Sequence, residues 1–272
     1  MPLITITGGI GSGTERIADL AARKTRLELF DDRRLALEAI KMGIRSEDLK
    51  GLNEKAPGFF DSLLHTPELY LDILESVVYA VSGSGQGIII GHGSQILLRE
   101  FGCAFHVRVH ASDDFRVQKV MNDLGLEREA AEKVIRKSDH ERRGFLRFAF
   151  HMDWNDHSLY DLIVNTEKLG IEGGADLIER ALGLQVVEEC GVNALETIER
   201  MGLVKKVEAA LLKAGIGSRI YTHIEAPEKG VIQVTGFATT EENRKAIMEI
   251  VRGTPGVVKV KGEVGLLPPS GA

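Results

Sequence analysis

Short apolar runs alternate with amphipathic segments of helix length along the first two thirds of the chain. The runs have strand length and are rich in apolar residues. They are residues 2–7, 27–30, 87–91, 104–110 and 160–166. Such runs are typical of strands buried on both faces of a parallel sheet. The segments between them repeat apolar residues at helical spacing, at residues 14–24, 32–42, 66–83, 113–125, 127–150 and 171–183. This alternation predicts an α/β fold, a doubly wound parallel sheet with helices on both faces.

The pattern changes after residue 183. Residues 184–202 have no clear periodicity and are interpreted as a linker. A compact order of helix, two strands, helix and strand follows, at residues 203–215, 219–226, 230–238, 240–253 and 257–264. We therefore predict a first domain over 1–183, a small α+β (αββαβ) domain over 203–264, and a frayed tail over 265–272.

A glycine-rich loop joins the first predicted strand to the first predicted helix. Such a loop binds phosphate through its backbone N–H groups and the positive end of the helix. Thr14 stands where a phosphate loop usually has lysine, and Glu15 where it usually has serine or threonine. Arg16 offers a cation two positions after the lysine site. The alternative is a tight turn without a ligand. The candidate nucleotide-binding residues are Gly8, Gly11, Ser12, Gly13, Thr14 and Arg16.

Residues 136–147 are rich in arginine. Arg136, Arg143 and Arg147 are spaced at i, i+7 and i+11, close to one helical face. Together with Arg142, they are the candidate catalytic residues, because phosphoryl transfer needs cations placed around developing negative charge. A helix carrying them could close over phosphates and exclude water. The alternative is a solvated helix with ion pairs along its surface.

Five stretches together resemble the cytidylate kinase-like family, a branch of the P-loop nucleoside monophosphate kinases. They are GSGTERIA, GIIIGHGS, the helix carrying Arg116, IRKSDHERRGFLRF and LYDLIVNT, and the resemblance covers residues 3 to about 182. It implies a three-layer P-loop fold that transfers a phosphoryl group from ATP, with Mg²⁺, to a pyrimidine nucleoside monophosphate such as CMP or dCMP. It also implies a monophosphate-binding insertion at 40–66 and an arginine-bearing lid at about 127–153. The chain departs from the family where Thr14-Glu15-Arg16 displaces the usual cation and where His92 replaces a common arginine.

Three further residues are candidates for substrate binding. Arg116 lies early in its helix, where it could reach a phosphate or pair with Asp113. Asp31 follows the second strand, where it could contact the acceptor nucleotide or cap a helix. Asp161 lies at a strand end, where it could contact the acceptor or serve the structure alone. The polar cluster at 151–157 is interpreted as a loop, and we predict no metal site made by side chains alone.

Composition narrows the class of protein. The chain has 272 residues, of which 43% are hydrophobic and 27% charged, and its net charge of −6 argues against general nucleic-acid binding. Cys103 and Cys190 lack metal-site spacing, and Cys103 is expected to be a small core residue. No apolar run reaches roughly 18 residues, and no secretory signal is visible, so we expect a cytoplasmic protein without membrane insertion.

Residues 203–264 resemble a BON domain, a module found in bacterial envelope and stress proteins. The resemblance rests on VKKVEAALLKAG, GVIQVTGFA and TPGVVKVKGEV. It implies binding of a ligand, a membrane surface or a protein partner, and it brings no catalytic motif.

Three functions follow from the sequence: an ATP-dependent kinase with an added binding module, a catalytically weak or inactive nucleotide-binding regulator, and a scaffold that uses the C-terminal surface alone. The oligomeric state and the acceptor base stay open.

Overall fold

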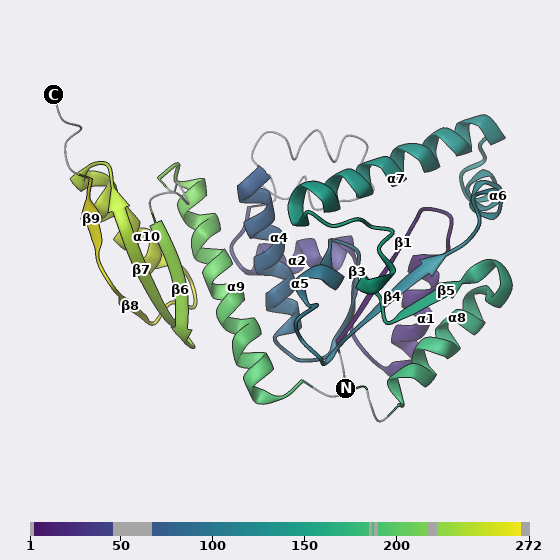
Figure 1. Ribbon diagram of the computed structural model, residues 1–272, viewed down its shortest axis with the longest axis horizontal. Helices are drawn as coiled ribbons and strands as arrows, with labels where there is room; N and C mark the ends of the chain where they lie inside the picture. Colours follow the sequence, from purple (N-terminus) through teal and green to yellow (C-terminus); the bar gives the residue numbers. More distant parts are fainter. Residues whose placement is uncertain (1–2, 46–66, 185–186, 188–189, 217–221, 268–272) are drawn as a thin grey trace.

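A five-stranded parallel sheet forms the centre of the larger unit (Figure 1). The computed structural model describes residues 3–45, 67–184, 187, 190–216 and 222–267. The strands are β1 (Leu3–Gly8), β2 (Leu29–Phe30), β3 (Gly87–Ile90), β4 (Ala104–His110) and β5 (Leu162–Asn165), in the order β2-β3-β1-β4-β5. All four neighbouring pairs are parallel, which confirms the predicted sheet.

Helices cover both faces of this sheet. Their bounds are α1 (Thr14–Thr25), α2 (Asp32–Lys41), α4 (Pro67–Ser82), α5 (Ser94–Leu97), α6 (Asp113–Leu124), α7 (Arg128–Phe150), the 3₁₀ turn η2 (His157–Leu159) and α8 (Thr166–Leu182). Side chains alternate between the faces of a strand, so Leu3 of β1 packs in the core under α2 and α4. The next residue, Ile4, packs in the core under α1 and α8. The three-layer α/β architecture is therefore confirmed.

The arginine-rich segment is one helix, α7, which runs along one edge of the larger unit (Figure 1). It ends at His151, whose φ of 54° places that residue in the left-handed region. The predicted lid is thus helical over most of its length. Most of the insertion predicted at 40–66 lies outside the described residues.

A second, four-stranded sheet forms the C-terminal unit. It contains β6 (Thr222–Glu228), β7 (Val231–Ala238), β8 (Lys259–Lys261) and β9 (Val264–Leu266), with α10 (Glu241–Gly253). The prediction of a single last strand over 257–264 is wrong, because the strand is interrupted at Gly262. There φ is 88°, and a Cβ would lie 2.3 Å from the Val234 carbonyl oxygen. The predicted tail is also corrected, since β9 extends to Leu266 and pairs with β7.

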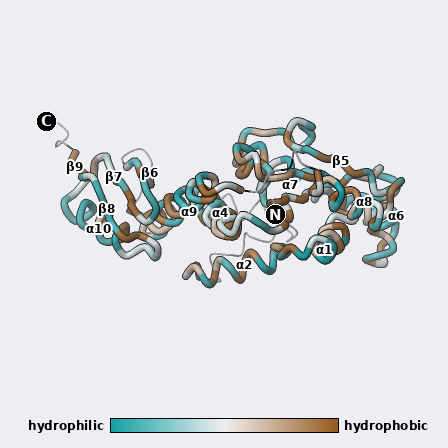
Figure 2. Tube along the Cα trace, turned by 90° about the horizontal axis from the view of Figure 1, so that it is seen from below, coloured by the Kyte–Doolittle hydropathy of each residue, from teal (hydrophilic) through white to brown (hydrophobic). Residues whose placement is uncertain are grey.

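The linker predicted over 184–202 does not end where expected. One helix, α9 (Val192–Lys213), runs through the proposed boundary at 202/203 and lies beside α4 in both views (Figures 1 and 2). The division into domains itself stays a prediction. No helix in the described parts of the chain has both the length and the apolar composition needed to cross a membrane.

A cluster of charges fastens α9 to α4. The ammonium of Lys205 lies 2.8 Å from Glu75, 3.1 Å from Glu208 and 3.5 Å from Asp72, whose side chain is fully buried. Burial opposes the charge on Lys205, but the three carboxylates outweigh it and raise the pKa of the amine. These ion pairs therefore hold α9 against α4 of the larger unit.

A disulfide joins Cys103, just before β4, to Cys190, just before α9. Their Cα atoms are 4.9 Å apart, although the residues are separated by 87 positions in the sequence. Cys103 is a buried core residue, as expected, but the sequence analysis did not foresee its bond to Cys190. Disulfides are rare in reducing compartments, so this bond does not favour the predicted cytoplasmic location.

Replacing Cys190 by serine should lower the free energy of unfolding by about 2–5 kcal/mol, since a cross-link over a long loop restricts the unfolded chain. Cys190 is half-buried, so serine leaves little unfilled volume. Denaturant unfolding measures the change. Dithiothreitol should produce a similar loss in the parent protein and none in the variant; a parent protein insensitive to the reductant would argue against the bond.

Candidate active site

The glycine loop between β1 and α1 is ordered by its own hydroxyl groups. Ser12 donates a hydrogen bond of 2.7 Å to the Gly9 carbonyl, and its hydroxyl lies 2.9 Å from that of Thr14. Thr166, at the start of α8, donates to the Ser12 carbonyl. No side chain caps the N-terminus of α1. The first N–H groups of this helix can therefore donate hydrogen bonds to an anion.

Close packing explains why the loop needs glycine. A Cβ on Gly8 would lie 2.5 Å from the Val109 carbonyl oxygen at the end of β4. Gly11 and Gly13 have φ angles of 81° and 85°, which residues with a Cβ rarely adopt. The loop thus has the backbone form expected for a phosphate cradle.

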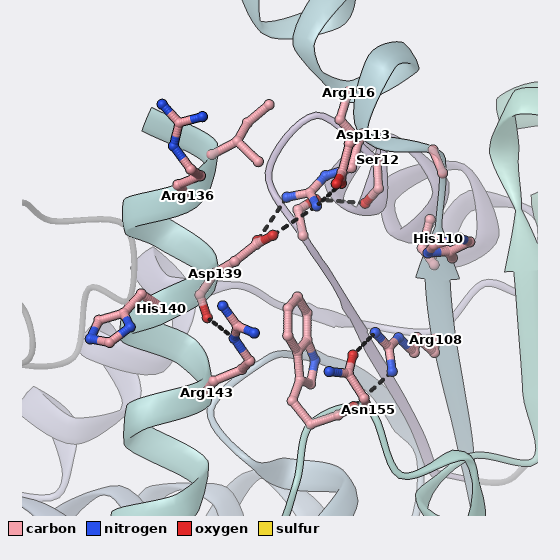
Figure 3. Close-up of a pocket in the computed structure, with 15 residues that line it drawn as sticks. Ser12, Arg108, His110, Asp113, Arg116, Arg136, Asp139, His140, Arg143 and Asn155 are labelled. Carbon is pink, nitrogen blue, oxygen red and sulfur yellow. Dashed lines mark hydrogen bonds and ion pairs between the residues drawn. The ribbon is translucent and has the colours of Figure 1, made fainter. Parts of the chain in front are cut away.

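Arg116 of α6 lies directly against the loop, as Figure 3 shows. Its Nε donates to the Ile10 carbonyl at 2.8 Å, and its two terminal nitrogens bond the Asp139 carboxylate at 2.7 and 2.8 Å. A Cβ on Gly9 would lie 2.5 Å from Arg116 Nη2. This nearly buried guanidinium is held in a bidentate ion pair beside the point where a phosphate would sit. The alternative predicted pair with Asp113 is also present, at 3.3 Å.

Helix α7 presents arginines to both sides of the loop. Arg142 donates from Nη1 to the Gly8 carbonyl oxygen. Arg143 donates to the backbone carbonyl of Asp139 and projects toward β4. Arg136 is mostly exposed and pairs with Glu132 at 3.4 Å. The helix is therefore already in contact with the loop that it was predicted to cover.

Two cavities adjoin the loop. The larger, of about 500 Å³, lies between the loop, β4, α6 and α7, and Arg116, Arg136 and Arg143 line it. The second, of about 300 Å³, lies between the loop and α7, and its polar lining is Thr14, Glu15, Lys137, Ser138, Glu141 and Arg142. The loop residues predicted to bind phosphate thus lie beside three of the arginines predicted to catalyse its transfer, Arg136, Arg142 and Arg143.

The sequence reasoning missed Arg108, a buried arginine on β4 that also lines the larger cavity. It donates to the Trp154 carbonyl at 2.7 Å and to Asn155 Oδ1 at 2.9 Å. Its guanidinium stacks 4.9 Å from the Trp154 ring centre and 5.5 Å from that of Tyr160. An arginine between two valines, inside a strand predicted to be buried, was the signal that could have identified it.

Four predicted site residues lie apart from both cavities. Arg16 is exposed on α1, and Arg147 is exposed one turn beyond Arg143. Asp31 caps α2 by accepting from the Arg34 N–H. Asp161 precedes β5, at the sheet edge opposite the loop, and accepts from the backbone N–H of His106. These positions fit the structural alternatives that the sequence left open. The nucleotide-binding role of Arg16, the catalytic role of Arg147 and the substrate roles of Asp31 and Asp161 stay predictions.

The comparisons with known proteins agree with this geometry. The model of the "Cytidylate kinase-like family" matches residues 3–168. A cytidylate kinase of Pyrobaculum islandicum is 26% identical over 175 residues, covering 63% of this chain and 87% of the relative. One of Archaeoglobus fulgidus is 23% identical over 187 residues, covering 68% and 97%. The crystal structure of an uncharacterized protein from Eubacterium ventriosum has a TM-score of 0.51 at 17% identity, covers 68% of this chain and all of its own, and supports the fold alone.

Proposed function

The chain belongs to the cytidylate kinase-like family, and we propose that it transfers the terminal phosphoryl group of ATP to a pyrimidine nucleoside monophosphate such as CMP or dCMP. Family membership supports nucleotide kinase activity. The choice of a pyrimidine acceptor rests on the names of the relatives. The C-terminal unit is proposed to be a BON-like binding module, on the order of its helices and strands.

The observation that carries the proposal is the convergence of arginines from three separate elements on one cavity at the glycine loop. Arg108 comes from β4, Arg116 from α6 and Arg143 from α7. The transferred group carries charge on its outer oxygens, so catalysis consists mainly of holding cations and backbone donors in place. In this arrangement the loop N–H groups hold the donor phosphates, the arginines stabilise the transferred group, and α7 excludes water.

The cation missing from the loop has a structural substitute. Arg16, the nearest basic residue in the sequence, is exposed and lines neither cavity. Arg142 instead reaches the Gly8 carbonyl from α7 and lines the second cavity with Thr14. We therefore assign to Arg142 the role that the loop lysine has in the common motif.

Replacing Arg142 by glutamine should lower kcat at least tenfold and raise the KM for ATP, because the charge beside the donor phosphates is lost. An Arg16→Gln variant is the matched control and should stay within twofold of the parent enzyme. Steady-state kinetics with varied ATP measure both. If the Arg16 variant lost activity and the Arg142 variant kept it, the assignment would be reversed.

The loop residues fit a magnesium ion bound mainly through phosphates. Mg²⁺ in nucleotide sites keeps several waters and takes one or two protein oxygens. The adjacent hydroxyls of Ser12 and Thr14 are the oxygen donors at the start of α1, and Thr14 is the residue that would hold the ion. When bound, Mg²⁺ neutralises charge that develops on the phosphates.

A coupled ADP-release assay with ATP and Mg²⁺ tests the function across CMP, dCMP, UMP and AMP. Turnover with CMP or dCMP well above that with AMP is the expected result. Turnover with AMP alone would contradict the pyrimidine acceptor while leaving the kinase fold intact.

A second candidate function is a nucleotide-binding regulator without turnover. Threonine in the lysine position and the placement of Glu15 beside the second cavity favour it, since a carboxylate there repels phosphate. Measurable ATP binding with no ADP release for any acceptor would support this function over the kinase.

A further inference from the structure

Two adjoining cavities separate the larger unit from the C-terminal unit. Each has a volume of about 370 Å³, and both are lined by Met42, Ser76, Lys206 and Pro255. We call them together the α4–α9 groove, because both cavities are lined by residues of those two helices, among them Ser76 and Lys206. The apolar part of its wall comprises Ile44, Leu69, Ile73, Ala209, Ala210 and Ile250.

Lys206 is a cation that lines both cavities of this groove. It is half-buried, and burial lowers the pKa of its amine. Within the described part of the chain it makes no ion pair or hydrogen bond, whereas the preceding Lys205 contacts three carboxylates. Withdrawing an ammonium group from water without a partner is unfavourable. An anion in the groove would remove that cost.

The acidic residue that the structure describes on the lining of the groove is already neutralised. Glu199 is the single acidic residue among the described lining residues, and Lys229 neutralises it at 2.8 Å. Among the described lining residues the groove is thus apolar along its wall, and Lys206 is the cation available to an anion.

We propose that the α4–α9 groove is a binding site for a small carboxylate with an unbranched apolar body. The carboxylate pairs with Lys206, and the apolar body lies along the wall that α4, α9 and α10 form. Cavities of this size are typical of small-molecule sites, which combine an apolar lining with a few polar groups that fix orientation. This site is separate from the glycine loop, and it requires no catalytic activity.

Calorimetric titration of the full chain with decanoate tests the proposal. We expect saturable binding of one decanoate per chain with a Kd below about 1 mM, and binding at least tenfold weaker for decanol, which lacks the charge. Lys206→Met should weaken decanoate at least tenfold. Lys245→Met, which removes an exposed lysine from α10, should change it less than twofold.

A blocking variant separates the groove from other apolar surfaces. Ala210→Trp places a large side chain in the groove from a partly exposed position and should abolish binding, while its circular dichroism spectrum matches that of the parent protein. Failure to bind decanoate, or binding unchanged in both the Lys206 and Ala210 variants, would overturn the proposal. Equal affinity for decanol would overturn the pairing with Lys206.

Discussion

Replacing Arg116 by methionine should lower phosphoryl transfer at least 100-fold, a loss of about 2.7 kcal/mol of transition-state stabilisation. Arg116 is the most buried of the arginines around the loop, and it is held by both the Ile10 carbonyl and Asp139. A charge fixed in a site that excludes water acts strongly on developing negative charge. The measurement is kcat for ADP release at saturating ATP and acceptor.

Two further variants test whether the loss is specific to the guanidinium group of Arg116. Arg116→Lys retains the charge, but it cannot bond Ile10 and a second group in the same forked geometry, so it should still lose at least tenfold. Arg128→Met is the control, because it removes an exposed arginine that pairs with Asp114 and Glu132. It should keep the parent rate. Full activity of a folded Arg116→Met variant would exclude this arginine from catalysis.

Gly13→Val should abolish nucleotide binding. Gly13 has a φ of 85°, and a Cβ there would lie 2.6 Å from Ile171 Cδ1. A branched side chain at this point forces the loop away from the helix N-terminus, so the N–H groups no longer converge on a phosphate. Equilibrium binding of a fluorescent ATP analogue measures the loss.

The control for this variant is Gly102→Val, at a glycine with no atom within 4 Å of a Cβ. It should bind nucleotide as the parent protein does. Both variants are compared by circular dichroism, so that loss of binding is not confused with loss of fold. Normal affinity in a folded Gly13→Val protein would mean that the loop is only a turn.

The sequence predicted the parallel sheet and the loop because both depend on local signals. Runs such as Gly87–Ile90 are apolar throughout and fully buried in the structure, and the spacing of Gly8, Gly11 and Gly13 is set by backbone conformations that few other residues allow. Arg136 and Arg143, which helical periodicity places close to one face of α7, line one cavity together with loop residues Gly9 and Ser12.

Contacts between distant segments could not be predicted in this way. The bond between Cys103 and Cys190 depends on how α9 packs against α4, which no periodicity reveals. The same holds for Asp139 of α7, whose carboxylate holds Arg116 of α6. Spacing placed Arg147 with Arg143, but the cavity wall ends before that turn of α7.

The Gly8–Gly13 loop is, by this proposal, a phosphate cradle completed by arginines from α6 and α7. The most direct measurement is a crystal structure with a non-hydrolysable ATP analogue, CMP and Mg²⁺. We expect the donor phosphates to be bound by the loop N–H groups. The guanidinium groups of Arg142 and Arg116 should lie within hydrogen-bonding distance of phosphate oxygens. A nucleotide bound elsewhere, or a loop left empty at saturating ligand, would contradict it.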